Sequence, residues 1–279
     1  MNEFLSQFAA QLRRDVLRMT FGASSGHPGG SLGCADLFSL LYNEILRYRP
    51  AYFSLNGSGE DVFLLSNGHI SPVWYSTLAR TGFFDTAELA TFRKLDSRLQ
   101  GHPSPHEGIP GVRIASGSLG QGLSVGIGMA LAKRLNGDDH LVLVLMGDGE
   151  LQEGQIWEAA MYAGSKKVDN LIGIVDYNGI QIDGPVDQVL TLGQLDQKWK
   201  SFGWNVLSMN GHDFDDMRLT LKDAINHSSK GVPTVILMNS TLGKGVDFME
   251  NNHKWHGSPP NAEQLKTALA QIPETLGDY

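Results

Sequence analysis

Residues 141–154 read LVLVLMGDGELQEG, and this stretch decides the fold class. The apolar run LVLVLM is continuous rather than alternating, which is typical of a strand buried on both faces of a parallel sheet. Gly147 and Gly149 flank Asp148 directly after the run, so backbone can approach a ligand closely while a carboxylate faces it. A helix beginning near Leu151 would offer free backbone amides to an anion. The stretch therefore predicts a ligand site at the end of a buried strand.

The same pattern of buried strands and helices recurs along the chain. Four more strands are expected, namely DVFLLS at 61–66, LIGIVD at 171–176, WNVLSM at 204–209 and PTVILMN at 233–239. Helices are expected over residues 4–19 and 35–45, and in QGLSVGIGMALAKRL, EGQIWEAAMYAG and FDDMRLTLKDAINH, whereas GASSGHPGGSLG reads as a loop. The prediction is an α/β fold, a doubly wound, mainly parallel sheet with helices on both faces. No repeat or linker divides the chain, so residues 1–279 are expected to form a single domain.

Composition excludes several classes of protein. The 279 residues carry a formal net charge of −8 with no basic run, which argues against a nucleic-acid partner. Apolar runs reach only about seven residues, far short of a membrane span. The N-terminal residues carry early acids and do not resemble a secretory signal. A single cysteine, Cys34, fits a reducing compartment. We therefore expect a cytoplasmic globular protein.

Asn178 supplies a second oxygen ligand near Asp148. It follows LIGIVD by two residues and lies thirty positions after Asp148, about one strand–helix–strand unit. Both side chains can then emerge at the carboxyl edge of neighbouring parallel strands, where ligands bind. A carboxylate, an amide oxygen and a backbone carbonyl from the following turn suit Mg²⁺, which keeps water and substrate phosphates as further ligands. Each motif alone is as well explained by a turn, and Asn-Gly is a strong turn pair. The pair at this spacing favours a metal–diphosphate site.

The segment GDGELQEGQIWEA, followed by VDYNGIQIDG, resembles the signature of enzymes that use thiamine diphosphate. The resemblance implies that Asp148 and Asn178 hold a divalent metal, Mg²⁺ or else Ca²⁺ or Mn²⁺, through their side chains, and Ile180 through its carbonyl. That metal would carry the diphosphate of the cofactor. Gly147, Gly149 and Ile182 would line the cofactor beside it.

Further motifs narrow the family. Six motifs are similar in order and spacing to motifs of transketolase. They are SSGHPGGSLG at 24–33, LSNGH at 65–69, GHPS at 101–104, SGSLGQG at 116–122, TLGKG at 241–245 and KWHG at 254–257. The resemblance extends from about residue 20 to 260 and concerns only the N-terminal part of transketolase. It implies the diphosphate-binding domain of a thiamine diphosphate enzyme.

Four histidines occupy these loop motifs. A histidine taken singly is more often a surface or hydrogen-bonded core residue. A ketol transfer, however, needs several proton-handling groups, and imidazoles suit that work. The resemblance implies that His102 contacts the donor ketose near its C1 hydroxyl. It also implies that His27 and His256 polarise substrate oxygens, His256 lying near the diphosphate as well, while His69 faces the diphosphate.

Several other residues are implied in cofactor binding or catalysis. Gly117 and Leu119 would line the thiazolium ring. Lys244 is a candidate charge for the diphosphate, with a solvated loop lysine as the equal alternative. Glu153, and with it Glu158, would lie at a subunit interface that links paired active sites, although from the sequence alone an exposed helix carboxylate is the better explanation of either residue.

The resemblance also implies a partner. In transketolases, a glutamate on a pyrimidine-binding domain activates the cofactor, and no such domain fits after the KWHG motif. It is expected on a separate chain, a C-terminal transketolase subunit, in an α2β2 heterotetramer. The expected activity is that of the N-terminal subunit of a split transketolase, which moves a two-carbon ketol unit from a ketose or ketose phosphate to an aldose or aldose phosphate, as in the pentose phosphate pathway.

Three alternatives stay open at this point. The α subunit of a 2-oxoacid dehydrogenase shares the metal motif, but GHPGG, SNGH and KWHG are not expected in it. A transketolase relative could be specialised for an unusual sugar, such as a sulfonated or deoxy ketose. A non-catalytic cofactor-binding module would not require the four loop histidines.

Overall fold

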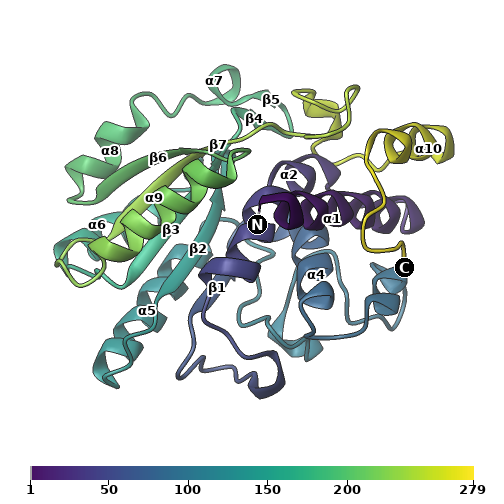
Figure 1. Ribbon diagram of the computed structural model, residues 1–279. Coiled ribbons are helices and arrows are strands. Elements are labelled where there is room, and N and C mark those ends of the chain that lie inside the picture. The colour runs from purple at the N-terminus through teal and green to yellow at the C-terminus, as the bar shows by residue number, and fades with distance from the viewer. Residues whose placement is uncertain (1) are drawn as a thin grey trace.

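A five-stranded parallel sheet forms the centre of the computed structural model, which describes residues 2–279 (Figure 1). Its strands are β1 (Val62–Leu65), β2 (Val142–Gly147), β3 (Leu171–Tyr177), β6 (Asn205–Asn210) and β7 (Thr234–Asn239). They lie in the order β1-β2-β3-β7-β6, and every neighbouring pair is parallel. Each strand lies within one residue of its predicted bounds, so the predicted parallel sheet is confirmed.

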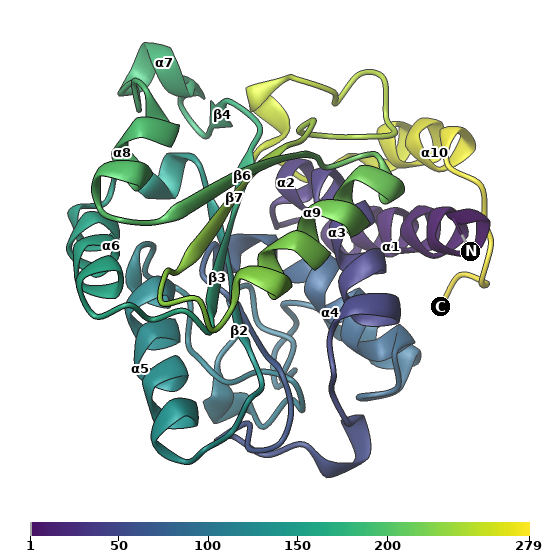
Figure 2. The ribbon, with the colours of Figure 1, turned by 60° about the vertical axis from the view of Figure 1, so that its left-hand side comes forward.

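Helices cover both faces of this sheet. One face packs against α1 (Asn2–Gly22), α3 (Ala35–Leu40), α4 (Ser71–Arg80), α9 (Phe214–His227) and α10 (Ala262–Gln271). The other packs against α5 (Gln121–Leu135), α6 (Gly154–Ser165) and α8 (Leu195–Ser201). Figure 2 shows the sheet between these two groups, with α5, α6 and α8 on the left. A small hairpin of β4 (Ile180–Gln181) and β5 (Gly184–Pro185), followed by α7 (Val186–Val189), comes after β3.

Alternate residues of each strand enter two separate cores. In β2, Leu143 and Leu145 belong to the core beside α1, whereas Val142, Val144 and Met146 belong to the core beside α5. All five side chains are buried. A strand with two buried faces needs apolar residues at every position, which explains the continuous run LVLVLM.

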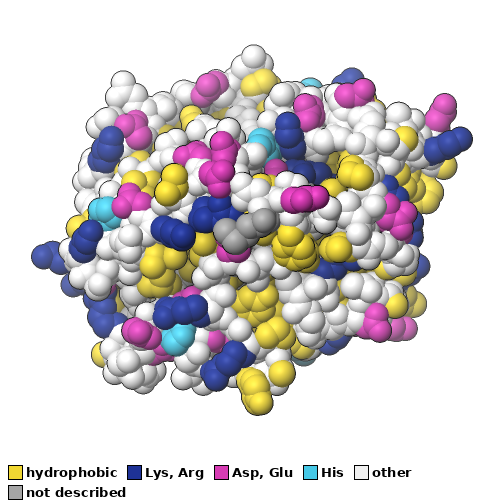
Figure 3. Space-filling view, viewed as in Figure 1, with side chains coloured by type: hydrophobic (Ala, Val, Ile, Leu, Met, Phe, Trp, Pro, Cys, Tyr) yellow, Lys and Arg dark blue, Asp and Glu magenta, His cyan; other side chains and the backbone are white. Residues whose placement is uncertain are grey.

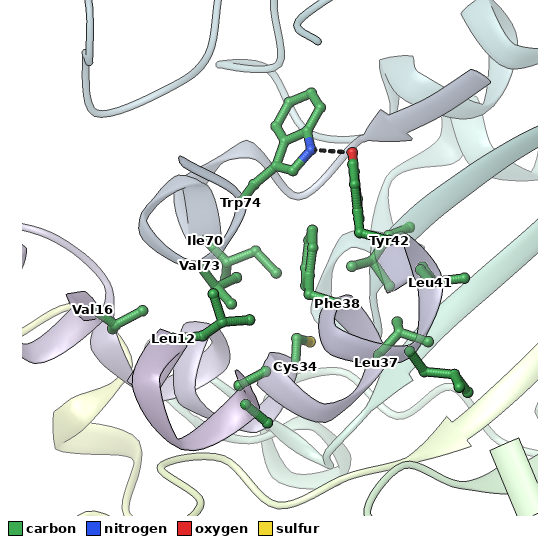
Figure 4. Close-up of a cluster of buried hydrophobic side chains, with 14 of the residues drawn as sticks. Leu12, Val16, Cys34, Leu37, Phe38, Leu41, Tyr42, Ile70, Val73 and Trp74 are labelled. Carbon is green, nitrogen blue, oxygen red and sulfur yellow. Dashed lines mark hydrogen bonds between the residues drawn. The ribbon is translucent and has the colours of Figure 1, made fainter. Parts of the chain in front are cut away.

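The core on the α1 face extends to the edge of the candidate site. Phe38 of α3 and Leu12 of α1 lie in this cluster, and the Trp74 indole of α4 donates a hydrogen bond of 2.6 Å to the Tyr42 hydroxyl (Figure 4). Ile70, which precedes α4, belongs to the same cluster and also lines the pocket described below. The buried cluster therefore fixes one wall of the pocket.

The segment GASSGHPGGSLG, expected to be a loop, instead contains the short helix α2 (Pro28–Gly33). Proline is favoured in the first turn of a helix because its missing N–H has no partner there. A Cβ added at Gly29 or Gly33 would lie 2.8 Å from the backbone oxygen of Trp255 or Thr241, respectively. The glycines therefore permit a close approach between α2 and the segment 241–255, a contact that the sequence did not indicate. The helix predicted over 35–45 also changes, because its last turn, Leu41–Ile45, is a π-helix.

The surface carries charges of both signs. In the face shown in Figure 3, basic and acidic side chains are interspersed without a basic stripe. Within residues 2–279, no helix is both long and apolar enough to cross a bilayer.

Candidate functional site

A pocket opens where β2 and β3 end. Many residues that the sequence predicted for the cofactor or metal line it, namely His69, Leu119, Gly147, Asp148, Gly149, Asn178, Ile180, Ile182 and His256. They come from five separate segments of the chain. The carboxyl edge of a parallel sheet collects these segments, as expected for this fold.

Asp148 lies directly after β2 and is only 2% exposed. Its Oδ1 accepts a hydrogen bond of 2.7 Å from the Gly149 N–H, and its Oδ2 accepts one of 2.5 Å from the Gly179 N–H. The carboxylate is thus held between the turns that follow β2 and β3.

Asn178 is fixed in a similar way after β3. Its Nδ2 donates to Asp176 Oδ2 at 2.9 Å, and its Oδ1 accepts from the Ile180 N–H at 2.9 Å. The parallel register pairs Gly147 with Asp176, which brings the two strand ends side by side. Asp148 and Asn178 therefore face one pocket, as the sequence spacing suggested.

This part of the pocket carries excess negative charge. Asp148 and Asp176 are both buried, and neither forms a salt bridge with a Lys or Arg among residues 2–279. Burial and the charge of Asp176 raise the pKa of Asp148 to about 7, although backbone N–H groups oppose the shift. Burial also raises the pKa of Asp176. Two buried carboxylates beside an amide oxygen, without an internal cation, fit a divalent metal with oxygen ligands.

The four loop histidines come together beside this acidic region. The ring centroids of His27 and His69 lie 5.0 Å apart, and those of His27 and His256 lie 5.8 Å apart. His69 and His256 are separated by 5.1 Å, and His102 lies 6.5 Å from His27. His102 is exposed, whereas the other three are half-buried. The fold thus brings four loops, distant in sequence, to one cluster.

These imidazoles are neutral near pH 7. Burial, followed by the neighbouring His256, Arg93 and His102, lowers the pKa of His27 to about 4. Burial also lowers the pKa of His69 and of His256. Partial burial, followed by the positive charge of Arg93, lowers the pKa of His102. A neutral imidazole has one N–H donor and one acceptor nitrogen.

Some of this hydrogen-bonding capacity has no partner within the protein. The Nδ1 atoms of His27 and His256 are buried and have no hydrogen-bond partner among residues 2–279. The same holds for Asn67 Oδ1, on the loop that also carries His69. Buried polar atoms normally find partners, so these atoms fit a ligand rich in hydroxyl groups, which can both donate and accept.

Other predicted residues lie outside the pocket lining. Gly117 lies near His102, since a Cβ added to it would be 4.0 Å from the His102 Cβ. Glu153 is exposed and begins α6 as its N-cap, and Glu158 is exposed on the same helix. Lys244 Nζ lies 3.6 Å from a Glu250 carboxylate oxygen. The roles assigned to these residues stay predictions.

Two acidic residues of the pocket were missed in the sequence. Asp176 is the single acid in the strand LIGIVD, and an acid within a buried strand is a signal that could have been used. Glu150 lines the pocket and is only 2% exposed, although in GDGELQEG it reads as an ordinary acid of a helix start. Two of its three hydrogen-bond partners, Ser66 and Gly120, lie on other segments, so no local pattern indicated its burial.

Comparison with known proteins agrees with this geometry. Residues 6–274 match the family model described as "Transketolase, thiamine diphosphate binding domain". An apulose-4-phosphate transketolase subunit of Phocaeicola vulgatus is 38% identical over 264 residues, which cover 95% of this chain and 92% of that protein. The 6-deoxy-6-sulfo-D-fructose transketolase subunit of Clostridium sp. strain MSTE9 is 36% identical and is matched over 88% of both chains.

Among solved structures, the transketolase of Campylobacter jejuni superposes with a TM-score of 0.87 at 37% identity. The match covers 98% of this chain and 43% of that one, so this chain spans less than half of the solved enzyme. The shared fold, the matched family model and the relatives named as subunits lead to one conclusion: the chain belongs to the transketolase family, as its N-terminal, thiamine diphosphate binding domain.

Proposed function

We propose that this chain is the diphosphate-binding subunit of a two-chain transketolase, which transfers a two-carbon ketol unit from a ketose to an aldose. The observation that carries the proposal is the cluster of four loop histidines beside the buried Asp148–Asn178 pair. The pair suits a metal-bound diphosphate, and the histidines suit the hydroxyl and carbonyl oxygens of a sugar.

The lining of the pocket supports the assignment of residues to the cofactor. Asp148 and Asn178 would bind Mg²⁺ through their side chains and Ile180 through its carbonyl, while His69, Leu119 and Ile182 would line the cofactor. When bound, thiamine diphosphate supplies the thiazolium carbon that attacks the ketose carbonyl. The chain itself supplies binding, orientation and groups that handle protons.

The histidines are assigned to the sugar. His102, the exposed member of the cluster, would contact the C1 hydroxyl of the donor. His27 and His256 would donate to, or accept from, the carbonyl and hydroxyl oxygens through nitrogens that have no partner within the protein. All four rings are neutral near pH 7, so each has one unprotonated ring nitrogen. That nitrogen can accept a proton while the other keeps its N–H.

A second chain is proposed to complete the active site. The relatives named as subunits support this arrangement, since they match this chain over most of their own length. The partner would supply the pyrimidine-binding domain with its glutamate, in an α2β2 assembly within the cytoplasm. Exposed apolar side chains on α5 and α6, namely Val125, Met161 and Tyr162, provide a surface that suits such a partner.

The sugar is proposed to be a ketose with a phosphate or another anionic group. The names of the two relatives refer to apulose-4-phosphate and to 6-deoxy-6-sulfo-D-fructose, which favours a specialised ketose as the second candidate. Donors of both kinds therefore belong in any assay.

Reconstitution tests the proposal. The chain, a pyrimidine-binding partner of roughly 300 residues, thiamine diphosphate and Mg²⁺ are combined, and ketol transfer between ketose and aldose panels is followed. We expect transfer only in the mixture. Full activity of this chain alone would contradict the two-chain arrangement. Decarboxylation of a 2-oxoacid in place of ketol transfer would identify the dehydrogenase alternative, and cofactor binding without turnover would identify a non-catalytic module.

A further inference from the structure

Glu150 connects three segments that surround the pocket. Its Oε1 accepts hydrogen bonds from the Ser66 hydroxyl and from the Gly120 N–H, the latter at 2.8 Å. Its Oε2 accepts a hydrogen bond of 3.0 Å from the Gly147 N–H. These donors belong to the loop after β1, to the SGSLG segment and to the end of β2. One buried carboxylate thus links all three.

Close packing leaves these segments little freedom to adjust. A Cβ added at Gly122 would lie 2.3 Å from Ser66 Oγ, and one added at Gly68 would lie 2.2 Å from the Ser116 backbone oxygen. Ser66 Oγ also accepts a hydrogen bond of 3.1 Å from the Gly122 N–H. A displacement of either the loop after β1 or the SGSLG segment would therefore be transmitted to the other.

We infer that Glu150 is a positioning residue for the cofactor pocket: its carboxylate holds the SGSLG segment and the GDG turn together, so that Leu119 and Asp148 face the same space. The inference deepens the proposed function and rests on it. Glu150 acts through Leu119 and Asp148, which both line the pocket, because its own two oxygens are occupied by the three donors.

The chemistry of the three donors requires a carboxylate. An ionised carboxylate accepts at both oxygens and donates at neither, which matches two backbone N–H groups and a hydroxyl. In Glu150→Gln, one oxygen is replaced by an NH₂ group, which would point at the Gly147 N–H in one orientation and at the Gly120 N–H in the other. Ser66 can rotate its hydroxyl, but a backbone N–H cannot. Each orientation leaves one buried N–H unpaired. The cost is equivalent to a decrease of roughly 5- to 150-fold in the population of molecules in which the three segments are held together.

The test compares Glu150→Gln with Leu221→Ala. Leu221 is fully buried in α9 and has no part in the pocket, so its truncation reports general loss of stability. Two quantities are measured: hydrogen exchange of peptides spanning residues 116–122 and 146–150 in the chain without cofactor, and the half-saturating concentration of thiamine diphosphate with Mg²⁺ in the chain mixed with its partner.

We expect faster exchange in both peptides and about tenfold weaker cofactor binding for Glu150→Gln, with turnover largely restored at saturating thiamine diphosphate. Leu221→Ala should lower the melting temperature at least as much while leaving the local exchange and the half-saturation near wild type. Unchanged exchange in Glu150→Gln, affinity within twofold of wild type, or the same losses in Leu221→Ala would each overturn the inference. If the wild-type mixture binds no thiamine diphosphate, the proposed function fails, and the exchange data still decide whether Glu150 links the three segments.

Discussion

The two halves of the pocket differ in how their polar atoms are satisfied. In the acid half, formed by Asp148, Asp176 and Asn178, every side-chain oxygen and nitrogen has a hydrogen-bond partner within the protein. In the histidine half, formed by the four loop histidines, the Nδ1 atoms of His27 and His256 have none among residues 2–279. The acid half is therefore already oriented, whereas the histidine half retains capacity for a ligand. The difference fits a fixed cofactor anchor beside a site for exchanging sugars.

Removing charge from the acid half should have the largest effect. Asp148→Asn keeps the shape of the side chain but removes the negative charge that would bind the metal, so we expect the affinity for thiamine diphosphate with Mg²⁺ to fall by at least about 100-fold. Titration calorimetry measures this loss. Asp223→Asn, at an exposed acid of α9, is the matched control. Binding within threefold of wild type in Asp148→Asn would remove Asp148 from the metal site.

Removing His102 from the histidine half should separate turnover from binding. In His102→Ala, we expect ketol transfer by the two-chain mixture to fall by about 100-fold or more, while cofactor binding stays within about threefold. His106→Ala, four residues away and also exposed, is the control and should retain activity. Unchanged turnover in His102→Ala would show that the exposed histidine does not handle the substrate.

The histidine half should also make stability depend on pH. A histidine whose pKa is lowered in the folded protein contributes full stability above its unfolded pKa near 6.5 and loses that contribution as pH falls through the folded value. For His27 the window runs from about pH 6.5 to about 4. Partial exposure moderates the effect, and we expect about 2 kcal/mol less acid destabilisation in His27→Asn than in wild type. Urea denaturation between pH 7.5 and 4.5 measures it, and parallel curves for both proteins would contradict the burial argument.

The smallest effect is expected outside both halves. Lys244 lies 3.6 Å from a Glu250 carboxylate oxygen, and both side chains are partly exposed. We expect Lys244→Gln to weaken cofactor binding by less than about threefold, since exposed charges contribute little in water. A decrease of tenfold or more in cofactor affinity would indicate that Lys244 contacts the diphosphate, so that the cofactor site includes a residue outside the acid half.

The sequence predicted those features that depend on local periodicity. Short, largely apolar segments located all five strands, and the spacing from Asp148 to Asn178 placed both at one sheet edge because adjacent parallel strands end together. Long-range contacts were less visible. The glycine-rich segment of α2 was predicted to be a loop. Its glycines pack against the backbone of Trp255 and Thr241, which are more than 200 residues away in the sequence, so no local pattern indicated this contact. Glu150 was missed for the same reason, since its partners lie on segments up to 84 residues away.

The contact between α2 and the segment 241–257 has a consequence for the order in which the pocket is assembled. The Gly243 N–H donates to the Gly29 carbonyl at 2.8 Å, and the His27 and His256 rings lie beside each other across this junction. During synthesis, the acid half and the hydrogen-bond partners of its side chains have all emerged from the ribosome once Ser240 has done so, but the histidine half must wait for His256. A nascent chain halted between these two residues would therefore contain every residue of the cofactor anchor but lack His256, one of the three histidines assigned to the sugar.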